Sequence, residues 1–571
     1  MFDVVVTGGR VIDGSGEPAV ASDLAIDAGR IVEIAPPGRV SDRGARTIDV
    51  GGLVVTPGFV DLHTHYDAQL FWDPTASPSP LHGVTTVFGG NCGFTLAPCG
   101  DEHVDYLSRL MARVEGIPLP ALQEGVPWGW HSFADYLDAL DGRIAVNAGF
   151  LVGHSALRRM VMGAAASSDE ASEADVAAMA QLLHEAVSAG ALGFSSSQSH
   201  THHDGDGVPV PSRFASRDEL VALASVLRDH DGTQLEWIVA GCINGFSEEE
   251  VELLADLSHA AASPLNWNVL SVGGGVQHEH QLSASTFAAE HGAEVVALTL
   301  PNTMQIRLSF LSGFVLDGLP GWDEFLHRPV EDRLRALRDP EVRRDLDTRA
   351  NSPEAGMLAA LAQWDRLTVV EGFTPETRRF EGQQVGEIAA QQGKEPFDAL
   401  IDIVIADGLR TGVQPRFPDA TDDTWRARVE VWNDPRAVIG GSDAGAHLDM
   451  MSMSTYSTFL LGEAVRERGL LDLEAAVHLL TARPAELYGL RDRGRIAEGA
   501  WADLVAFDPD VVGPLPARTR DDLPGGASRL YAGSTGIEHV LVNGVEIARG
   551  SEFTGDTPGA LLRSGRDTTT A

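Results

Sequence analysis

Two histidines one residue apart, His63 and His65, are the residues of this chain best suited to chemistry. They lie in the run Val-Asp-Leu-His-Thr-His-Tyr-Asp, residues 60–67, which follows an apolar segment. On a β-strand, alternate side chains point to the same face, so the two imidazoles share a face with Asp61 and Asp67. A single histidine on a strand is more often a satisfied polar residue than a ligand. Two at this spacing can hold one ion from a rigid backbone, so we expect His63 and His65 to bind a metal.

A cysteine and an aspartate elsewhere in the chain complete this candidate set. Cys92 stands in Gly-Gly-Asn-Cys-Gly, and its thiolate would suit zinc, although most buried cysteines are only small apolar residues. Asp443 stands in Gly-Gly-Ser-Asp-Ala-Gly. A carboxylate beside a metal can take a proton from the attacking water and later give it to a leaving amine. We therefore expect Asp443 to be a metal ligand and the general base, with an ordinary turn residue as the alternative.

Four further residues are candidates for contacts with a substrate. His202 belongs to a histidine-rich segment, residues 200–203, and loops of this composition bind metal or substrate in some proteins but are often only solvated. His154 follows a predicted strand, and His447 lies just beyond Asp443. An arginine should hold a substrate carboxylate in a bidentate pair. Arg213 is our candidate for this clamp because it follows the histidine-rich loop.

The middle of the chain supplies the elements that must bring these residues together, because strands and helices alternate there. In a closed parallel barrel the site lies at the carboxyl ends of the strands, and the candidates fall at those ends. A doubly wound open sheet is the alternative, and the lack of a glycine-rich dinucleotide fingerprint after the first strand disfavours it. We expect an α/β fold with eight barrel strands at Phe59–His65, Thr85–Asn91, Ala145–Gly153, Ala191–Ser197, Gln234–Ala240, Leu265–Val272, Glu294–Pro301 and Ala437–Asp443.

Composition excludes several classes of function. The 571 residues carry a net charge of −40, which argues against nucleic acid and anionic membrane surfaces as partners. Three cysteines are too few for a disulfide framework, and we find neither a signal peptide nor an apolar run of about 20 residues. We expect a cytoplasmic enzyme that acts on a small molecule. Whether it forms a homo-oligomer stays open, although two long connections, residues 98–142 and 311–436, could serve as lids, subdomains or contact surfaces.

Taken together, the motifs resemble the amidohydrolase superfamily, and within it the D-aminoacylase (N-acyl-D-amino-acid deacylase) group. The resemblance covers nearly the whole chain, and the spaced motifs occur in the order of the superfamily. The subgroup rests mainly on Asn-Cys-Gly. The motifs are Val-Thr-Pro-Gly-Phe-Val-Asp-Leu-His-Thr-His at 55–65, Gly-Val-Thr-Thr-Val at 83–87, Asn-Cys-Gly at 91–93, Gly-Ser-Asp at 441–443 and Gly-Ala-Trp-Ala-Asp-Leu-Val at 499–505.

The resemblance implies a (β/α)8 barrel, a TIM-like barrel, flanked by a small β-sandwich that both chain ends build. It places the N-terminal part of the sandwich at residues 1–55 and its C-terminal part at 490–550. The barrel then occupies 56–489, with insertions near 98–142 and 311–436. The remaining residues, 551–571, form a tail whose end we expect to be mobile.

The resemblance also implies hydrolysis of a C–N bond by water that one or two divalent ions, typically Zn²⁺, activate. Many superfamily members bridge two metals with a carboxylated lysine, but the only lysine here, Lys394, lies outside every predicted barrel strand. In the D-aminoacylase group a cysteine takes that place, and Cys92 matches it. The histidines usual at strands five and six are absent. Their substitutes would be oxygen ligands or histidines from other loops, namely Gln234, Glu236, Asn266, Asn268, His154 or His202.

Three hypotheses for function follow. The first is a metal-dependent hydrolase that deacylates N-acyl amino acids, with the D-configuration inherited from the resemblance alone. The second is a hydrolase of a cyclic amide such as a hydantoin or dihydropyrimidine. The third is a catalytically inactive binding or scaffold protein on an amidohydrolase frame, which the missing histidines suggest and His63, His65 and Asp443 argue against.

Overall fold

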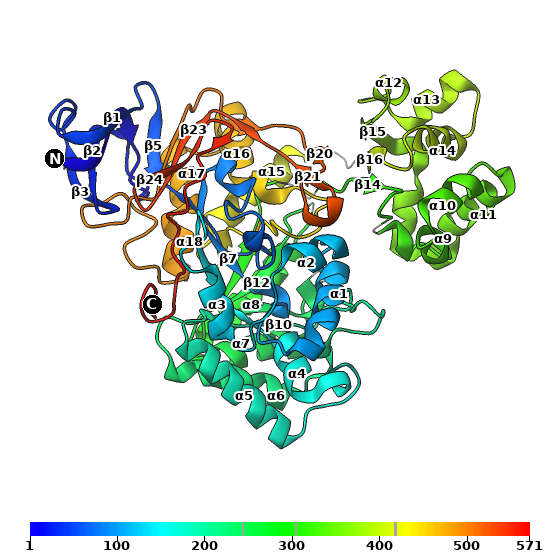
Figure 1. Cartoon of the computed structure of the whole chain (residues 1–571), viewed down its shortest axis with the longest axis horizontal. Helices are drawn as coiled ribbons and strands as arrows, with labels where there is room; N and C mark the ends of the chain where they lie inside the picture. Colours follow the sequence, from blue (N-terminus) through cyan, green and yellow to red (C-terminus); the bar gives the residue numbers. More distant parts are fainter. Residues whose placement is uncertain (243–244, 274, 303–304, 314, 416–419, 571) are drawn as a thin grey trace.

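The structure is a computed structural model that describes residues 1–242, 245–273, 275–302, 305–313, 315–415 and 420–570 (Figure 1). Parts of two predicted segments lie outside the described residues. These are residues 314 and 416–419 of the insertion predicted at 311–436, and residue 571 of the tail. The fold is mixed α/β, as expected from the sequence.

Strands from both ends of the chain pair in one sheet. Within the described residues the order is β25-β24-β23-β18-β5-β1-β2-β3, and β4 pairs with β1. Ala28 and Gly29 both have positive φ, which makes the two-residue turn that suits the twist of the hairpin β2–β3. Because the strands form one sheet, the two-sheet sandwich is not confirmed. The strands are β1 (Phe2–Val11), β2 (Val20–Asp27), β3 (Arg30–Ala35), β4 (Gly44–Asp49), β5 (Val54–Pro57), β18 (Leu504–Phe507), β23 (Ile537–Val542), β24 (Val545–Arg549) and β25 (Glu552–Phe553).

One buried carboxylate ties the two chain ends together in this sheet. The side chain of Glu546 on β24 is 1% exposed and forms ion pairs with Arg46 on β4, His539 on β23 and Arg549 on its own strand. Burial raises the pKa of Glu546, but hydrogen bonds from Arg549, His539 and Arg46 outweigh it and lower that pKa to about 2. The ionised form of Glu546 is therefore favoured in the folded chain.

We expect Glu546→Gln to lower the free energy of unfolding by about 1–2 kcal/mol at neutral pH, because it removes this charge. The folded pKa lies below the unfolded value, so this stability is present above the unfolded pKa and is lost as the pH falls through the folded one. Thermal unfolding of both proteins should show a gap in Tm at about pH 7 that narrows below about pH 4.5. A gap of constant size at every pH would contradict the argument.

Two parallel sheets form the middle of the chain and carry all eight predicted barrel strands. One sheet has the order β17-β13-β12-β11-β10-β9 and the other β6-β7-β8. Their side chains are mostly buried on both faces, which is the pattern of parallel sheets covered by helices. The strands are β6 (Phe59–Asp61), β7 (Val84–Gly89), β8 (Asn147–Phe150), β9 (Val152–Gly153), β10 (Gly193–Ser197), β11 (Gln234–Ile238), β12 (Leu265–Leu270), β13 (Val295–Thr299) and β17 (Ala437–Ile439).

The two sheets meet at both margins without a continuous strand ladder. At one margin Leu151 interrupts a single extended segment, whose first half, β8, pairs with β7 and whose second half, β9, pairs with β10. At the other, strand pairing of β6 stops at Asp61, yet Leu62 N donates to Gly440 O at 2.9 Å beyond the end of β17. A closed barrel is therefore not confirmed, because the ladder is broken at these two places in the part of the chain that is described.

Helices follow the strands and cover the parallel sheets (Figure 1). Ser172, Ser216 and Ser247 cap helices α5, α6 and α7 by accepting a backbone hydrogen bond from the first turn. The helices are α1 (Val104–Val114), α2 (Leu119–Gly125), α3 (Phe133–Leu140), α4 (His154–Met162), α5 (Glu173–Ser188), α6 (Arg217–Ser225), α7 (Glu248–Ala261), α8 (Gln277–Glu290), α15 (Asp422–Trp432), α16 (Tyr456–Phe459), α17 (Leu473–Leu480) and α18 (Ala482–Leu487).

The second long connection builds a core of its own. Buried Trp322, Trp364 and Phe397 pack in a hydrophobic cluster separate from the main one, and Figure 1 shows this body set off to one side. Trp425 and Trp432 of α15 belong instead to the main core. The elements of this body are α9 (Trp322–Leu326), α10 (Val330–Ala336), α11 (Pro340–Ala350), α12 (Pro375–Arg378), α13 (Val385–Gln392), α14 (Pro396–Ala406), β14 (Leu308–Ser309), β15 (Leu367–Glu371) and β16 (Gly412–Pro415).

The C-terminal tail is fixed against the parallel sheets, so the expectation of a mobile end is wrong. Leu562 N donates to Ala148 O at 2.8 Å, and Thr569 N donates to Gly489 O at 2.9 Å. Leu561 and Leu562 are buried. Composition suggested mobility, but backbone hydrogen bonds to β8 decide the outcome. In the described part of the chain, no helix combines the length and the apolar character needed to cross a membrane.

Candidate metal centre

Backbone hydrogen bonds fix the histidine pair just past the end of β6. Asp443 N donates to His63 O at 2.9 Å, and His65 N donates to Ala444 O at 2.7 Å. Asp61 holds the facing turn, because its carboxylate accepts from the backbone N–H and the hydroxyl of Ser442. The two imidazoles and the carboxylate of Asp443 therefore come from segments that are joined to each other directly.

Three ligand atoms of the kinds that bind zinc meet at this point. The donor atoms of His63, His65 and Cys92 all lie within 4.8 Å of one another, and the side chains are buried. The Cys92 Sγ lies 3.4 Å from His63 Nε2. The Asp443 Oδ1 lies 3.6 Å from His63 Nε2 and 3.0 Å from His65 Nε2. Two imidazoles, a sulfur and a carboxylate thus face one small volume.

The loop after β7 directs the sulfur of Cys92 into this cluster. Gly90 and Gly93 adopt positive φ, and Cys92 itself has a φ of 56°. A positive φ is costly for a residue with a Cβ, and such strain is commonly found at functional sites. Asn91 fixes the loop, because its side-chain nitrogen donates to Thr64 O at 3.0 Å and to Phe88 O at 2.9 Å. The Asn-Cys-Gly motif is therefore a turn that links the end of β7 to the segment after β6.

Two glutamates lie on the other edges of the histidine rings. Glu236 Oε1 lies 3.7 Å from His63 Nδ1, and Glu115 Oε1 lies 3.4 Å from His65 Nδ1. The second oxygen of Glu236 accepts from Cys92 N at 2.6 Å. Sequence reasoning named Glu236 only as a substitute ligand and missed Glu115, which lies in the long connection between β7 and β8.

A bound cation would stabilise the buried ionisable groups of this cluster. Burial raises the pKa of Glu115 and of Glu236 to about 8, and raises that of the Cys92 thiol well above its usual range. Burial lowers the pKa of His63 to about 3, which leaves the neutral imidazole that binds metals. A divalent ion would compensate the buried carboxylates and favour the thiolate. The donor set, two nitrogens with sulfur and oxygen, therefore fits zinc.

A cavity of about 540 Å³ opens onto the cluster. His65, Cys92 and Asp443 line it together with His202 and His447. Burial lowers the pKa of His202 to about 3, and its Nδ1 lies 2.8 Å from the Ser197 hydroxyl. The structure thus brings two of the four predicted substrate-contacting residues to the same cavity as the metal-ligand cluster.

The family model of the Amidohydrolase family matches residues 46–548 of this chain. The chain belongs to this family. It is 29% identical to D-aminoacylase of Alcaligenes xylosoxydans xylosoxydans over 577 residues, which cover 98% of this chain and 97% of the relative. It is 30% identical to N-acyl-D-glutamate deacylase of the same organism, over 96% of this chain and 93% of the relative.

A solved structure agrees with these relatives. N-acyl-D-glutamate deacylase from Bordetella bronchiseptica, complexed with zinc and a phosphonate mimic of the tetrahedral intermediate, matches with a TM-score of 0.64. It is 26% identical, and the match covers 98% of this chain and 99% of that one. The resemblance of the sequence motifs to the D-aminoacylase group is thereby confirmed.

Two predicted site residues of this amidohydrolase lie away from the cavity. His154 is fully buried, with Nδ1 at 2.8 Å from the Ser196 hydroxyl and Nε2 at 2.9 Å from Glu219 Oε1. Arg213 donates to backbone oxygens of His200 and His202. The structure therefore gives His154 and Arg213 local partners and does not place them among the residues that line either cavity described here.

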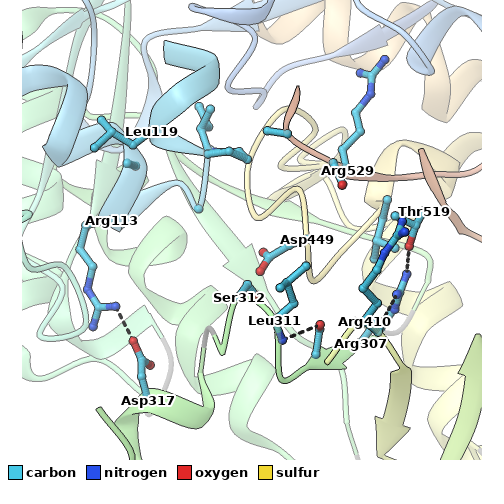
Figure 2. A pocket seen from close by; sticks show the side chains of 18 of the residues that line it. Arg113, Leu119, Arg307, Leu311, Ser312, Asp317, Arg410, Asp449, Thr519 and Arg529 are labelled. Carbon is cyan, nitrogen blue, oxygen red and sulfur yellow. Dashed lines mark hydrogen bonds and ion pairs between the residues drawn. The ribbon is translucent and has the colours of Figure 1, made fainter. Parts of the chain in front are cut away.

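A second cavity of this amidohydrolase, about 720 Å³, lies next to the first. The same two loops line both, since Glu115 and His447 face the first cavity while Gly116 and Asp449 face the second. Figure 2 shows Arg113 paired with Asp317 on one side and a group of polar side chains on the other. The arginines that line it are Arg109, Arg113, Arg307, Arg410 and Arg529.

Proposed function

We propose that this amidohydrolase is a metal-dependent deacylase of N-acyl amino acids, acting on a linear amide. The observation that carries the proposal is the convergence of His63, His65, Cys92 and Asp443 in one cluster, of which the last three line a single cavity. The similarity to D-aminoacylase and N-acyl-D-glutamate deacylase supports the acyl amino acid and its D-configuration. The bound zinc of the Bordetella enzyme supports one or two zinc-class ions.

In this proposal the four residues hold the metal and Asp443 moves the proton. When bound, the ion activates water and polarises the substrate carbonyl. The Asp443 carboxylate accepts the proton of the attacking water and donates it to the leaving amine nitrogen. Burial raises the pKa of Asp443, but the hydrogen bond and charge of His65 outweigh it and keep that pKa well below its usual range. With His65 neutral as a ligand, the charge of the bound ion would take over this role and keep the base ionised. His202 and His447 line the same cavity and are placed to orient the acyl group.

We also propose the finer architecture and setting expected from the sequence. The eight parallel strands would close as a TIM-like barrel within residues 56–489, supported by backbone hydrogen bonds between residues 62–65 and 440–444. The chain ends, 1–55 and 490–550, would form the small β-sandwich, followed by the tail at 551–571. The enzyme would be cytoplasmic and would take a small molecule as its partner; the net charge of −40 supports the exclusion of nucleic acid and of anionic membrane surfaces.

Metal analysis and a substrate panel test the proposal. Chelator-free protein should contain about one or more zinc-class ions per chain. It should hydrolyse N-acetyl amino acids, with D-isomers preferred, and leave hydantoins and dihydropyrimidines intact. Hydrolysis of only the cyclic amides would favour the second hypothesis. A chain without metal, inactive after addition of Zn²⁺, Mn²⁺ or Co²⁺, would favour the scaffold.

An arginine of the second cavity, rather than Arg213, is the better candidate for the substrate carboxylate. Arg113 lies two residues before Glu115 and lines the second cavity with its guanidinium paired to Asp317 at 2.7 Å. We expect Arg113→Met to lower kcat/KM for N-acetyl amino acids by about 10–100-fold, mainly through KM, because a charge-assisted pair is lost. Steady-state kinetics should show little change for an N-acyl amine that lacks the carboxylate.

Arg109 offers the matched control for this substitution. It lines the same cavity from the same helix, one turn earlier, and is paired with two carboxylates, Asp105 and Asp206, whereas Arg113 is paired with Asp317. Arg109→Met should change KM by less than about threefold. Equal effects of the two substitutions would show that the cavity acts only through its overall charge and would remove Arg113 as the specific clamp.

A further inference from the structure

We propose that Glu115 and Glu236 are positioning residues of the metal centre, each holding one histidine through its Nδ1 so that Nε2 faces the ion. This inference rests on the proposed function, because it requires that a metal binds at His63 and His65. It goes beyond the ligand set, because neither glutamate need touch the ion, and it assigns a task to two buried carboxylates that the proton transfer does not use.

Buried atoms of this site that lack a hydrogen-bond partner face one another in pairs. Among the described residues, the buried atoms at this site that have no hydrogen-bond partner include His63 Nδ1, His65 Nδ1, Glu115 Oε1 and Glu236 Oε1. Each nitrogen faces one of these oxygens, at 3.7 Å for His63 with Glu236 and 3.4 Å for His65 with Glu115. An unsatisfied buried polar group is costly, so a small closing movement in each pair would satisfy a donor and an acceptor together.

The two histidine rings are turned so that their Nε2 atoms face the centre of the cluster. The Nε2 atoms of His63 and His65 face Asp443, and His63 Nε2 also faces the Cys92 sulfur. In an imidazole the N–H of Nδ1 points away from the lone pair of Nε2, so an ion held at Nε2 lies on the opposite edge from the glutamates. A carboxylate at Nδ1 then fixes the tautomer and the ring orientation and makes Nε2 a stronger ligand.

Each glutamate residue also contacts a second part of the site. The other oxygen of Glu236 accepts from Cys92 N at 2.6 Å, so this side chain orients both a nitrogen ligand and the loop of the sulfur ligand. The backbone oxygen of Glu115 accepts from His447 N, which joins the long connection to the loop after Asp443. Loss of the Glu236 carboxylate should therefore loosen the loop of Cys92 as well as His63, whereas the backbone contact of Glu115 does not depend on its side chain.

Glu115→Gln and Glu236→Gln test the inference through metal affinity. We expect each variant to bind Zn²⁺ about 10–100-fold more weakly than the parent chain in competition with a chromogenic chelator. At saturating metal the stoichiometry should be unchanged. With Co²⁺ in place of zinc, the thiolate charge-transfer band should persist while the d–d bands shift, because the ligands remain but their orientation changes.

Glu219→Gln is the matched control, because Glu219 is also a buried glutamate against a buried histidine, at 2.9 Å from His154 Nε2. It should lower stability without changing metal affinity or the cobalt spectrum. Unchanged zinc affinity in both test variants would overturn the inference. A loss of one equivalent of metal at saturation would also overturn it, because the glutamate would then be a ligand. A parent chain that binds no metal would instead refute the proposed function itself.

Discussion

Asp443→Asn is expected to lower kcat for deacylation by about 10³-fold or more, because it removes the base that accepts the proton of water. The amide of asparagine keeps an oxygen that can face the ion but cannot take a proton at neutral pH. Asp443 is the only one of the four cluster residues that can both approach the metal and shuttle a proton to the leaving nitrogen. Its Oδ1 lies 3.0 Å from His65 Nε2, at the edge of the cavity where the substrate amide must lie.

The decisive measurement is single-turnover hydrolysis of an N-acetyl amino acid by metal-saturated protein, with metal content determined on the same sample. Circular dichroism should report an unchanged fold. Asp449→Asn is a suitable comparison, because Asp449 lies in the same loop but faces the second cavity. It should alter kcat by less than about tenfold. Near-normal turnover by metal-loaded Asp443→Asn would remove Asp443 from the proton transfer.

The core of the candidate site could be predicted because it follows from strand ends. His63, Cys92 and Asp443 each stand just beyond an apolar strand, and the parallel arrangement brings the carboxyl ends of neighbouring strands to one edge. Glycines around Cys92 signal a turn that a β-branched residue could not make. Local sequence patterns place each of these three residues at a strand end. The parallel sheet then brings the strand ends together, so no further long-range information was needed.

Glu115 could not be found this way, because nothing in its local sequence points to it. It follows α1 in the long connection, and only the tertiary path of that connection brings its carboxylate to His65. His154 is the opposite case, because the sequence predicts it as a site residue and the structure places it away from the cavity. It follows β9 as expected, but the chain begins α4 at this residue, and the ring packs against Glu219 and Ser196. Position at a strand end therefore limits where a side chain starts but not where it points.

Strand lengths and barrel closure could not be predicted from the sequence either. The apolar alternation predicts a strand through His65, yet strand pairing of β6 stops at Asp61. Asp61 instead binds the turn at Ser442, and burial raises the pKa of this carboxyl to about 7. The backbone after Asp61 hydrogen-bonds to the segment after β17 rather than continuing a regular ladder. The two histidines therefore lie on a segment that is held by the loop after β17 and not by a regular strand ladder.

Cys92→Ser should weaken zinc binding by about 100-fold or more, because a serine hydroxyl does not ionise as a thiol does and is a poor zinc ligand. Cys92 is the one sulfur in the cluster of His63, His65, Cys92 and Asp443, so its loss removes one of the four ligands that the proposal gives the ion. Burial raises the pKa of the free thiol well above its usual range, so the thiolate depends on the cation that it binds. Isothermal titration of the apo-protein with Zn²⁺ measures the loss.

Cys242 provides a control that isolates ligation from the mere presence of a buried thiol. Cys92 and Cys242 are each 7% exposed and line the same cavity, but Cys242 does not belong to the cluster with His63 and His65. Cys242→Ser should keep zinc affinity within about threefold of the parent. If Cys92→Ser binds zinc and turns over substrate as Cys242→Ser does, the ion does not use the sulfur. The histidine pair would then have to find its remaining ligands elsewhere, and the convergence on which the proposed function rests would have another cause.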